Sequence, residues 1–168
     1  MSYKTVRDNV ADRIDHEMKQ NEGMFDMSTW GRGCNTASCL AGHAVPPFTT
    51  ADNVAAAGAE NLGFPIAPRN ENGQYMETEH PFFTHPLPSE LTAWLRSLPD
   101  RELTADELRK ASKRLDESVQ ELLSNLNNYP DAIYHIEDDP LVDSVADNSI
   151  YLTCGGNLYL YGDGWELS

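Results

Sequence analysis

The chain has 168 residues, of which 27 are acidic and 12 are Lys or Arg, so its formal net charge is −15. This length suits one domain with its own hydrophobic core. The acidic excess argues against direct binding of nucleic acid, because phosphate contacts need clustered Lys and Arg. The sequence has neither a long apolar run nor a secretory signal pattern, so we expect a cytoplasmic protein without membrane contact.

The first part of the chain is predicted to be helical. An apolar residue recurs at every fourth position from Val6 to Met18, which predicts an amphipathic helix over residues 5–19 with Arg7 on its polar face. Two further helices rich in small residues are expected over 37–45 and 51–62. Residues 64–88 lose the helical period and are rich in proline, so we expect a long ordered loop there.

Helical signals return in the middle of the chain. A short helix is expected to start at Ser89, and the spacing of Thr104 and Glu107 is that of a capping box. The capping box predicts one long helix from Ala105 to Asn127. Its buried face is expected to include Leu115, Val119 and Leu122.

The end of the chain has the alternation of β structure. After an acidic segment over residues 139–147, two runs of aromatic and aliphatic residues flank Gly155 and Gly156, as in a β-hairpin. Because an isolated hairpin is marginally stable in water, it should pack on the helices or pair with residues 132–136.

The predicted fold class is therefore α+β, a mainly helical single domain with a C-terminal β-hairpin or small antiparallel sheet. The domain is expected to span residues 1–168, with the helical part at about 3–128 and the acidic segment and hairpin at about 131–168.

Cys34, Cys39 and His43 have the spacing C-x4-C-x3-H. Cys39 and His43 would share one face of a helix, so the trio could supply three of the four ligands of a zinc ion. A fourth sulfur or nitrogen ligand would come from His16, His80, His85, His135 or Cys154. The simpler expectation is that no cofactor is bound and that the cysteines are small buried side chains.

The same residues allow two other interpretations. A thiolate at a helix N-terminus is stabilised, so Cys34 could be a nucleophile placed as in papain-like enzymes, with His80, His85 or His135 as the base. No residue pattern fixes that base, so we lean towards a protein that is not an enzyme. A disulfide between Cys34 and Cys39 is geometrically possible, but a reducing cytoplasm argues against it. His80 and His85 are otherwise expected to be solvated.

Residues 25–45 begin with FDMSTW and end with CNTASCLAGHAV. This run resembles a motif of small uncharacterised proteins of bacteria and their phages, roughly Cys-Gly-Thr-x-x-Cys-(Ile/Leu)-Ala-Gly-(Trp/His)-Ala. Asn35 departs from it, since glycine is common at that position. The resemblance implies a shared structural element and a phage or mobile-element origin, and it supplies no catalytic residue.

The acidic residues are unevenly distributed. Eleven follow Arg114, and no Lys or Arg does. The candidate binding face comprises Glu137, Asp138, Asp139, Asp143 and Asp147, which lack the alternation and central glycine of a calcium loop. We expect this face to bind a host protein with a basic surface, such as a defence protein that normally handles nucleic acid and is inhibited by charge mimicry. Solubility or salt adaptation is the alternative explanation of the acidity.

Overall fold

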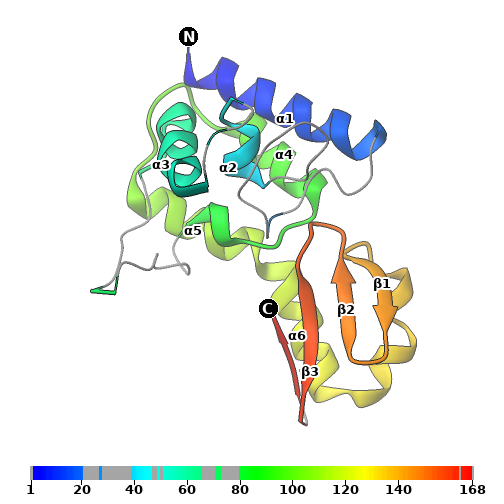
Figure 1. The fold of residues 1–168 in the computed structure, drawn as a ribbon. Helices are drawn as coiled ribbons and strands as arrows, with labels where there is room; N and C mark the ends of the chain where they lie inside the picture. Colours follow the sequence, from blue (N-terminus) through cyan, green and yellow to red (C-terminus); the bar gives the residue numbers. More distant parts are fainter. Residues whose placement is uncertain are drawn as a thin grey trace.

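The computed structural model describes residues 2–20, 27, 39–46, 49, 51–65, 71–72, 80–162 and 164–167. It is an α+β protein with a mainly helical first part and a small sheet at its C-terminus, as predicted (Figure 1). The helical part contains α1 (Tyr3–Gln20), α2 (Leu40–His43), α3 (Ala51–Leu62), η2 (Pro81–Phe83), α4 (Pro88–Ser97), α5 (Ala105–Leu115) and α6 (Glu117–Asn128). The remainder contains η3 (Pro130–Tyr134), η4 (Ile136–Asp138), β1 (Val142–Ala146), β2 (Ser149–Leu152), β3 (Asn157–Tyr161) and β4 (Gly164–Leu167).

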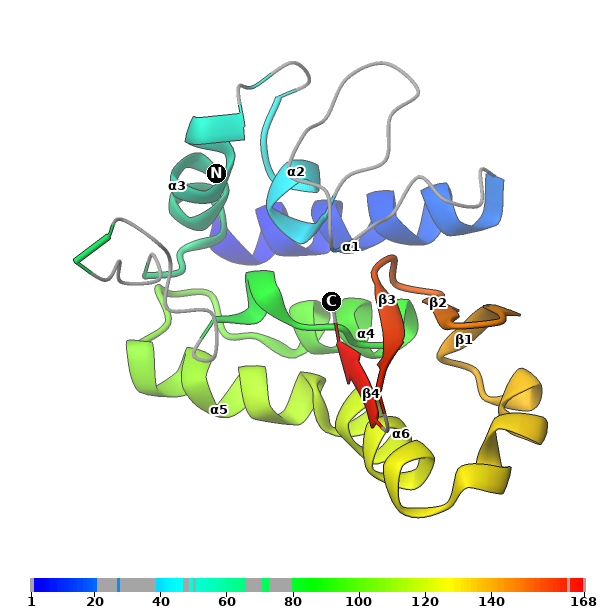
Figure 2. The ribbon, with the colours of Figure 1, turned by 60° about the horizontal axis from the view of Figure 1, so that its bottom comes forward.

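Helix α1 lies along α4, and α2 packs between α1 and α3 (Figure 2). One cluster of buried apolar side chains extends from α1 through the middle helices to β3. The predicted amphipathic face of α1 is part of this cluster, but Arg7 is not on a polar surface. Its side chain is completely buried, and its guanidinium group donates hydrogen bonds to the main-chain carbonyl groups of Leu62 and Arg101.

The helix boundaries confirm some predictions and correct others. Helix α3 has the predicted range, and the Thr104–Glu107 capping box is formed at the start of α5. Helix α2 starts only at Leu40, because Cys39 has an extended backbone, and residues 35–38 lie outside the described residues. Helix α4 opens with Pro88 rather than Ser89, and Leu87 occupies its N-cap position without a capping hydrogen bond from the side chain.

The predicted long helix is two helices. Leu115, Val119 and Leu122 are buried as expected, but α5 ends and α6 begins at Asp116, whose φ is −90° and ψ is −4°. The Oδ1 atom of Asp116 accepts a hydrogen bond from the backbone N–H of His85 at 2.7 Å. The loop after η2 is thereby attached at the break between the two helices.

The C-terminal strands form an antiparallel sheet with the order β1-β2-β3-β4. The predicted hairpin is present as β2 and β3, and Gly155 and Gly156 have the positive φ angles that the turn requires. Its partner is β1, which lies in the segment expected to be merely acidic. Residues 132–136 are not a strand, because the chain after Pro130 forms the 3₁₀ turns η3 and η4.

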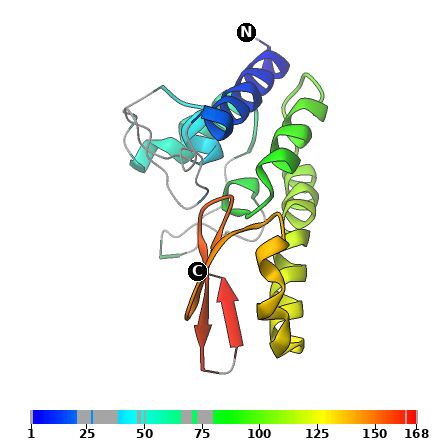
Figure 3. The same cartoon turned by 90° about the vertical axis from the view of Figure 1, so that its right-hand side faces the viewer.

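One face of the sheet packs against the helical part, and α6 lies beside β4 (Figure 3). None of the helices in the described ranges combines the length and apolar character needed to cross a bilayer.

Candidate functional site

The end of α6 and the two 3₁₀ turns enclose a groove. The chain leaves α6 at Tyr129, and Pro130 opens η3 with a backbone that cannot continue the α-helix. The backbone N–H groups of Ala132 and His135 donate to carbonyl groups three residues earlier, at 2.9 and 3.0 Å. The buried side chain of Ile136 then fixes η4 against the core. This path places the acidic residues of η4 opposite the last turns of α6.

The groove has a volume of about 620 Å³. Its apolar side chains come from α6, η3 and η4, while aspartates and a tyrosine stand at its rim. The lining residues are Leu122, Asn125, Tyr129, Asp131, Ala132, His135, Ile136, Asp138 and Asp139, and we call this site the acidic groove. The tyrosine at the end of α6 is 67% exposed, which is unusual for a large aromatic ring. An apolar floor with a negative rim can bind the stem and the charge of a basic side chain together.

The five acidic residues of the predicted binding face come from two neighbouring segments, since η4 contacts β1. Asp138 and Asp139 line the acidic groove, and Glu137 is exposed beside them on η4. Asp143 is exposed on β1, and Asp147 is exposed in the turn between β1 and β2. The structure therefore divides the predicted face into an η4 group and a β1 group.

Asp139 has a structural task as well. Its Oδ1 atom accepts a hydrogen bond from the backbone N–H of Leu141 at 2.9 Å, and the backbone N–H of Asp139 itself donates to Ile136. The carboxyl group thus closes the turn that leads from η4 to β1. Asp131 and Asp138 are exposed and line the groove as well.

The ion pairs of the described residues all lie between residues 4 and 110, as in the pairs of Arg96 with Asp12 and Asp15. From Asp116 onward the chain offers no Lys or Arg that could neutralise a carboxylate. Glu137 and Asp138 consequently face solvent, where a positively charged partner can reach them. Among the described residues, the acidic groove is thus a negative site without a Lys or Arg in its lining.

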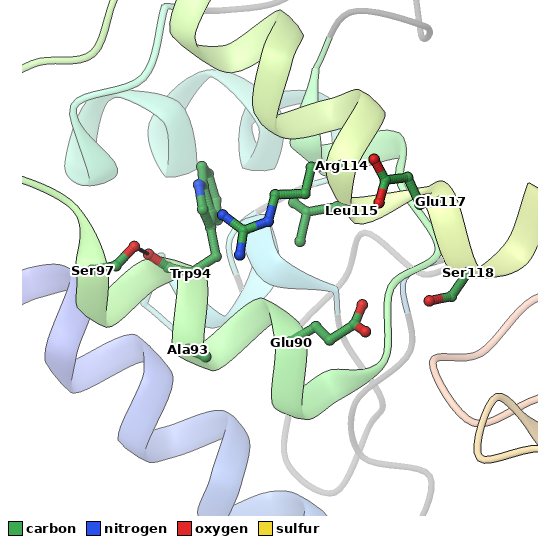
Figure 4. Close-up of a pocket in the computed structure, with 8 residues that line it drawn as sticks. All are labelled: Glu90, Ala93, Trp94, Ser97, Arg114, Leu115, Glu117 and Ser118. Atoms are coloured by element: carbon green, nitrogen blue, oxygen red, sulfur yellow. Dashed lines mark hydrogen bonds between the residues drawn. The ribbon is translucent and has the colours of Figure 1, made fainter.

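A second hollow of about 300 Å³ lies between α4 and the junction of α5 with α6 (Figure 4). The side chain of Arg114 extends over Leu115 towards the ring of Trp94, and Glu90 points into the same space from α4. This hollow contains charges of both signs, because Arg114 lines it together with Glu90 and Glu117. It therefore lacks the single sign of the acidic groove.

The structure places Cys39 and His43 together but leaves the third residue of the predicted metal site open. Both side chains are buried, and the Nδ1 atom of His43 lies 3.0 Å from the carbonyl oxygen of Cys39. Cys34 lies outside the described residues. Within the part of the chain that is described, no three His, Cys, Asp or Glu side chains are grouped to hold a metal ion. Zinc binding or hydrolysis at Cys34, Cys39 and His43 stays a prediction.

The other candidate histidines have different environments. His80 is buried rather than solvated, and this burial lowers its pKa to about 4, although a hydrogen bond to the carbonyl of Pro65 opposes the shift. His85 is partly buried at the helix break, whereas His16 and His135 are exposed. Cys154 is buried in the turn between β2 and β3.

Sequence reasoning missed the apolar part of the groove. Tyr129 and Asp131 flank a proline immediately after a helix, a pattern that marks a turn but not a binding site. Ala132 and Ile136 were expected to be available for strand pairing, and their position on 3₁₀ turns became visible only in the fold.

Comparison with known proteins gives no match for this chain among protein-family models, curated proteins or solved structures. The resemblance of residues 25–45 to bacterial and phage proteins therefore stays a prediction.

Proposed function

We propose that this protein binds a basic surface of a partner protein through the acidic groove. The observation that carries the proposal is the groove itself, where an apolar floor is bordered by Asp131, Asp138 and the exposed ring of Tyr129. Interfaces are enriched in exposed aromatic residues, and a charged rim selects partners of the opposite sign. The uncompensated acidity of the chain after Arg114 supports this choice of partner.

The physical role of the charge is to accelerate and direct association. A negative surface attracts a basic partner over roughly 8 Å at physiological ionic strength, the distance beyond which salt screens the attraction. Once in contact, apolar stems and aromatic rings on the partner exclude water from the floor formed by Leu122, Ala132 and Ile136.

The partner that we propose is a host protein that normally binds nucleic acid. The acidic chain would inhibit this partner by placing carboxylates in the site where the partner binds phosphate groups. A protein of a defence system is a fitting target if the chain comes from a phage or mobile element. The support for this finer proposal is the net charge of −15 and the resemblance of the segment that contains Cys34 and Cys39.

The test compares capture of proteins from a nuclease-treated bacterial lysate by immobilised wild-type and variant protein. In the groove variant, Asp131→Lys, Glu137→Lys and Asp138→Lys replace exposed carboxylates, and Asp139 is kept because it closes a turn. We expect the wild-type protein to retain basic proteins at about 0.05 M NaCl and to release them at about 0.5 M NaCl or on addition of duplex DNA. The groove variant should retain far less.

The matched control reverses three carboxylates elsewhere, with Glu17→Lys, Glu60→Lys and Glu71→Lys. This control variant has the same net charge as the groove variant but leaves α6, η3 and η4 unchanged. Equal loss of binding in both variants would mean that net charge acts without a specific site. Retention of one protein by all three forms, unaffected by salt or DNA, would refute the proposal.

The alternative function is a zinc or hydrolytic site at Cys34, Cys39 and His43. The observation in its favour is that Cys39 and His43 are four residues apart at one helical turn and are both buried. Elemental analysis of the purified protein decides it, since stoichiometric zinc would support a metal site. Without zinc, rapid alkylation of Cys34 at neutral pH would support a reactive thiol.

A further inference from the structure

The sheet has an outer face that carries tyrosines. Ile150, Leu152 and Leu158 point inward and are buried, so alternation along the strands directs Tyr151 and Tyr159 to the opposite face. Tyr151 is 43% exposed and Tyr161 is 58% exposed. In Figure 3, α6 and the 3₁₀ turns lie together on one side of the strands.

The strand register gives the neighbours of these rings. Tyr151 pairs with Ser144 on one side and Asn157 on the other, while Tyr159 pairs with Ser149 and Glu166. We call the outward residues of these rows, together with the last exposed ring of β3, the tyrosine face: Ser144, Ser149, Tyr151, Asn157, Tyr159, Tyr161 and Glu166.

Two contacts hold the rings of Tyr159 and Tyr161 in place. The side-chain amide of Asn157 donates to the hydroxyl oxygen of Tyr159 at 3.0 Å, and the rings of Tyr159 and Tyr161 have their centroids 6.2 Å apart. The tyrosine side chain has few rotatable bonds, so ordering it in an interface costs little entropy. Tyrosine with serine and asparagine is also the composition of antibody surfaces that bind proteins.

The charge around the tyrosine face selects its partner. Glu166 belongs to the face, Asp143 and Asp147 stand on β1 and in the turn after it, and no basic residue occurs on any strand. A second copy of this chain would bring like charges together, so self-association through this face is disfavoured. Electron-rich rings among carboxylates suit a cation, and a cation is attracted to the ring faces as well as to the carboxylates.

We propose that the tyrosine face binds an arginine-bearing segment of the basic partner. The inference rests on the proposed function for the sign of the partner's charge, and it adds a second contact surface and a preference for arginine. The planar guanidinium group stacks on aromatic rings and can form two hydrogen bonds to one carboxylate, whereas the lysine ammonium is a compact and more strongly hydrated charge.

The test uses two synthetic peptides, nona-arginine and nona-lysine, whose binding to the full chain is measured by fluorescence anisotropy at physiological salt. We expect nona-arginine to bind about tenfold more tightly, since two exposed rings can each contribute a cation–π contact. In the double variant Tyr151→Thr and Tyr161→Thr, which keeps residues favourable to strands, this preference should disappear. The double variant Tyr151→Phe and Tyr161→Phe should keep it.

The matched control replaces the exposed tyrosine of η3, which does not line the acidic groove, with Tyr134→Thr, and should retain the preference. An arginine preference that survives in the threonine variant of the sheet, or that is lost equally in this control, would overturn the inference. Equal binding of both peptides by the wild-type protein would also overturn it. In that case the proposed function of the acidic groove would still be supported if the groove variant bound both peptides more weakly. Failure of both peptides to bind would reject the two proposals together.

Discussion

Arg7 joins three segments of the helical part through hydrogen bonds from one side chain. Its Nε atom donates to the carbonyl of Leu62 at 2.8 Å, and Nη2 donates to the carbonyl of Arg101 at 2.7 Å. Nη1 donates to the carbonyl of Pro99. Desolvation by burial lowers the pKa of Arg7, but a guanidinium group keeps its charge in proteins. The bond to Leu62 satisfies a buried main-chain acceptor at the end of α3 that would otherwise have no donor.

His80 is buried in its neutral form. Its Nδ1 atom accepts a hydrogen bond from the backbone N–H of Phe82 at 3.2 Å, so Nε2 carries the proton that is donated to the carbonyl of Pro65. The ring packs among aromatic side chains, with the centroid of Phe82 at 4.4 Å. Protonation would place a charge in this apolar environment.

The pH dependence of unfolding should reveal this histidine. Burial lowers the pKa of His80 from 6.5 to about 4, so the unfolded state binds the proton more readily than the folded state. The contribution of His80 to stability is therefore complete above pH 6.5, and roughly 3 kcal/mol is lost as the pH falls towards 4. Urea unfolding across this range measures the loss.

His80→Gln removes the titrating group and should flatten the pH dependence relative to the wild-type protein. His135→Gln is the control, because His135 is exposed. Carboxylates titrate in the same range in all three proteins, so only the difference between their curves is interpreted. Parallel curves for the wild-type protein and His80→Gln would show that His80 is accessible to protons in the folded state.

These two residues show where prediction from sequence ends at this scale. The helical period put Arg7 on a polar face, and the proline-rich surroundings of His80 indicated a solvated loop. Both are buried, because each satisfies backbone groups of segments far away in the chain, such as Leu62 for Arg7. No local pattern records which distant carbonyl groups need a donor.

At the scale of elements, α6 holds the sheet through its side chains. The amide of Asn127 donates to the carbonyl of Trp165 at 3.1 Å and accepts from the backbone N–H of Trp165 at 2.7 Å. Strand β4 is at the edge of the sheet, so these bonds use main-chain groups that have no partner strand. Asn127 therefore covers an edge and attaches β4 to α6.

Asn127→Ala should destabilise the protein by about 1–2 kcal/mol, because two hydrogen bonds are lost. Asn128→Ala is the matched control, since Asn128 bonds only to Ser124 on its own helix and should cost less than about 0.5 kcal/mol. Both changes gain the same helix propensity, so urea unfolding isolates the contact with the strand. Amide hydrogen exchange in β4 should accelerate only in Asn127→Ala. Equal stability of the two variants would mean that β4 is held by its pairing with β3.

Elements with local signals were predictable. Helix α3 and the capping box of α5 depend on residues that are close together in the sequence. The β2–β3 hairpin likewise depends on the adjacent pair Gly155 and Gly156. The break at Asp116 was missed, because it depends on a contact with His85, 31 residues away. Strand β1 was missed because it lies in an acidic segment, and only its pairing with β2 makes it a strand.

At the scale of the whole molecule, charge is segregated. The ion pairs of the described residues belong to the helical part before residue 111, and no Lys or Arg follows Arg114 in the sequence. The excess of charge at the end of the chain was visible in the sequence. The acidic groove was not, because it needs the reversal of the chain after Tyr129 to bring η4 beside α6.

This segregation leads to a prediction about salt. Repulsion among the carboxylates from Glu121 onward, a stretch of sequence without Lys or Arg, destabilises the C-terminal part, and salt screens that repulsion. The surface ion pairs of the helical part contribute little, so their screening costs little. Thermal unfolding should therefore shift to higher temperature as NaCl rises from about 0.01 M to about 0.5 M. The groove variant with Asp131→Lys, Glu137→Lys and Asp138→Lys should shift less, because its new positive charges already offset part of the repulsion.

NaCl and KCl should act alike if screening is the cause. If the unfolding temperature of the wild-type protein fell with salt, the ion pairs of the helical part would stabilise the fold more than the repulsion destabilises it. The carboxylates of the C-terminal part would then be too far apart to affect stability.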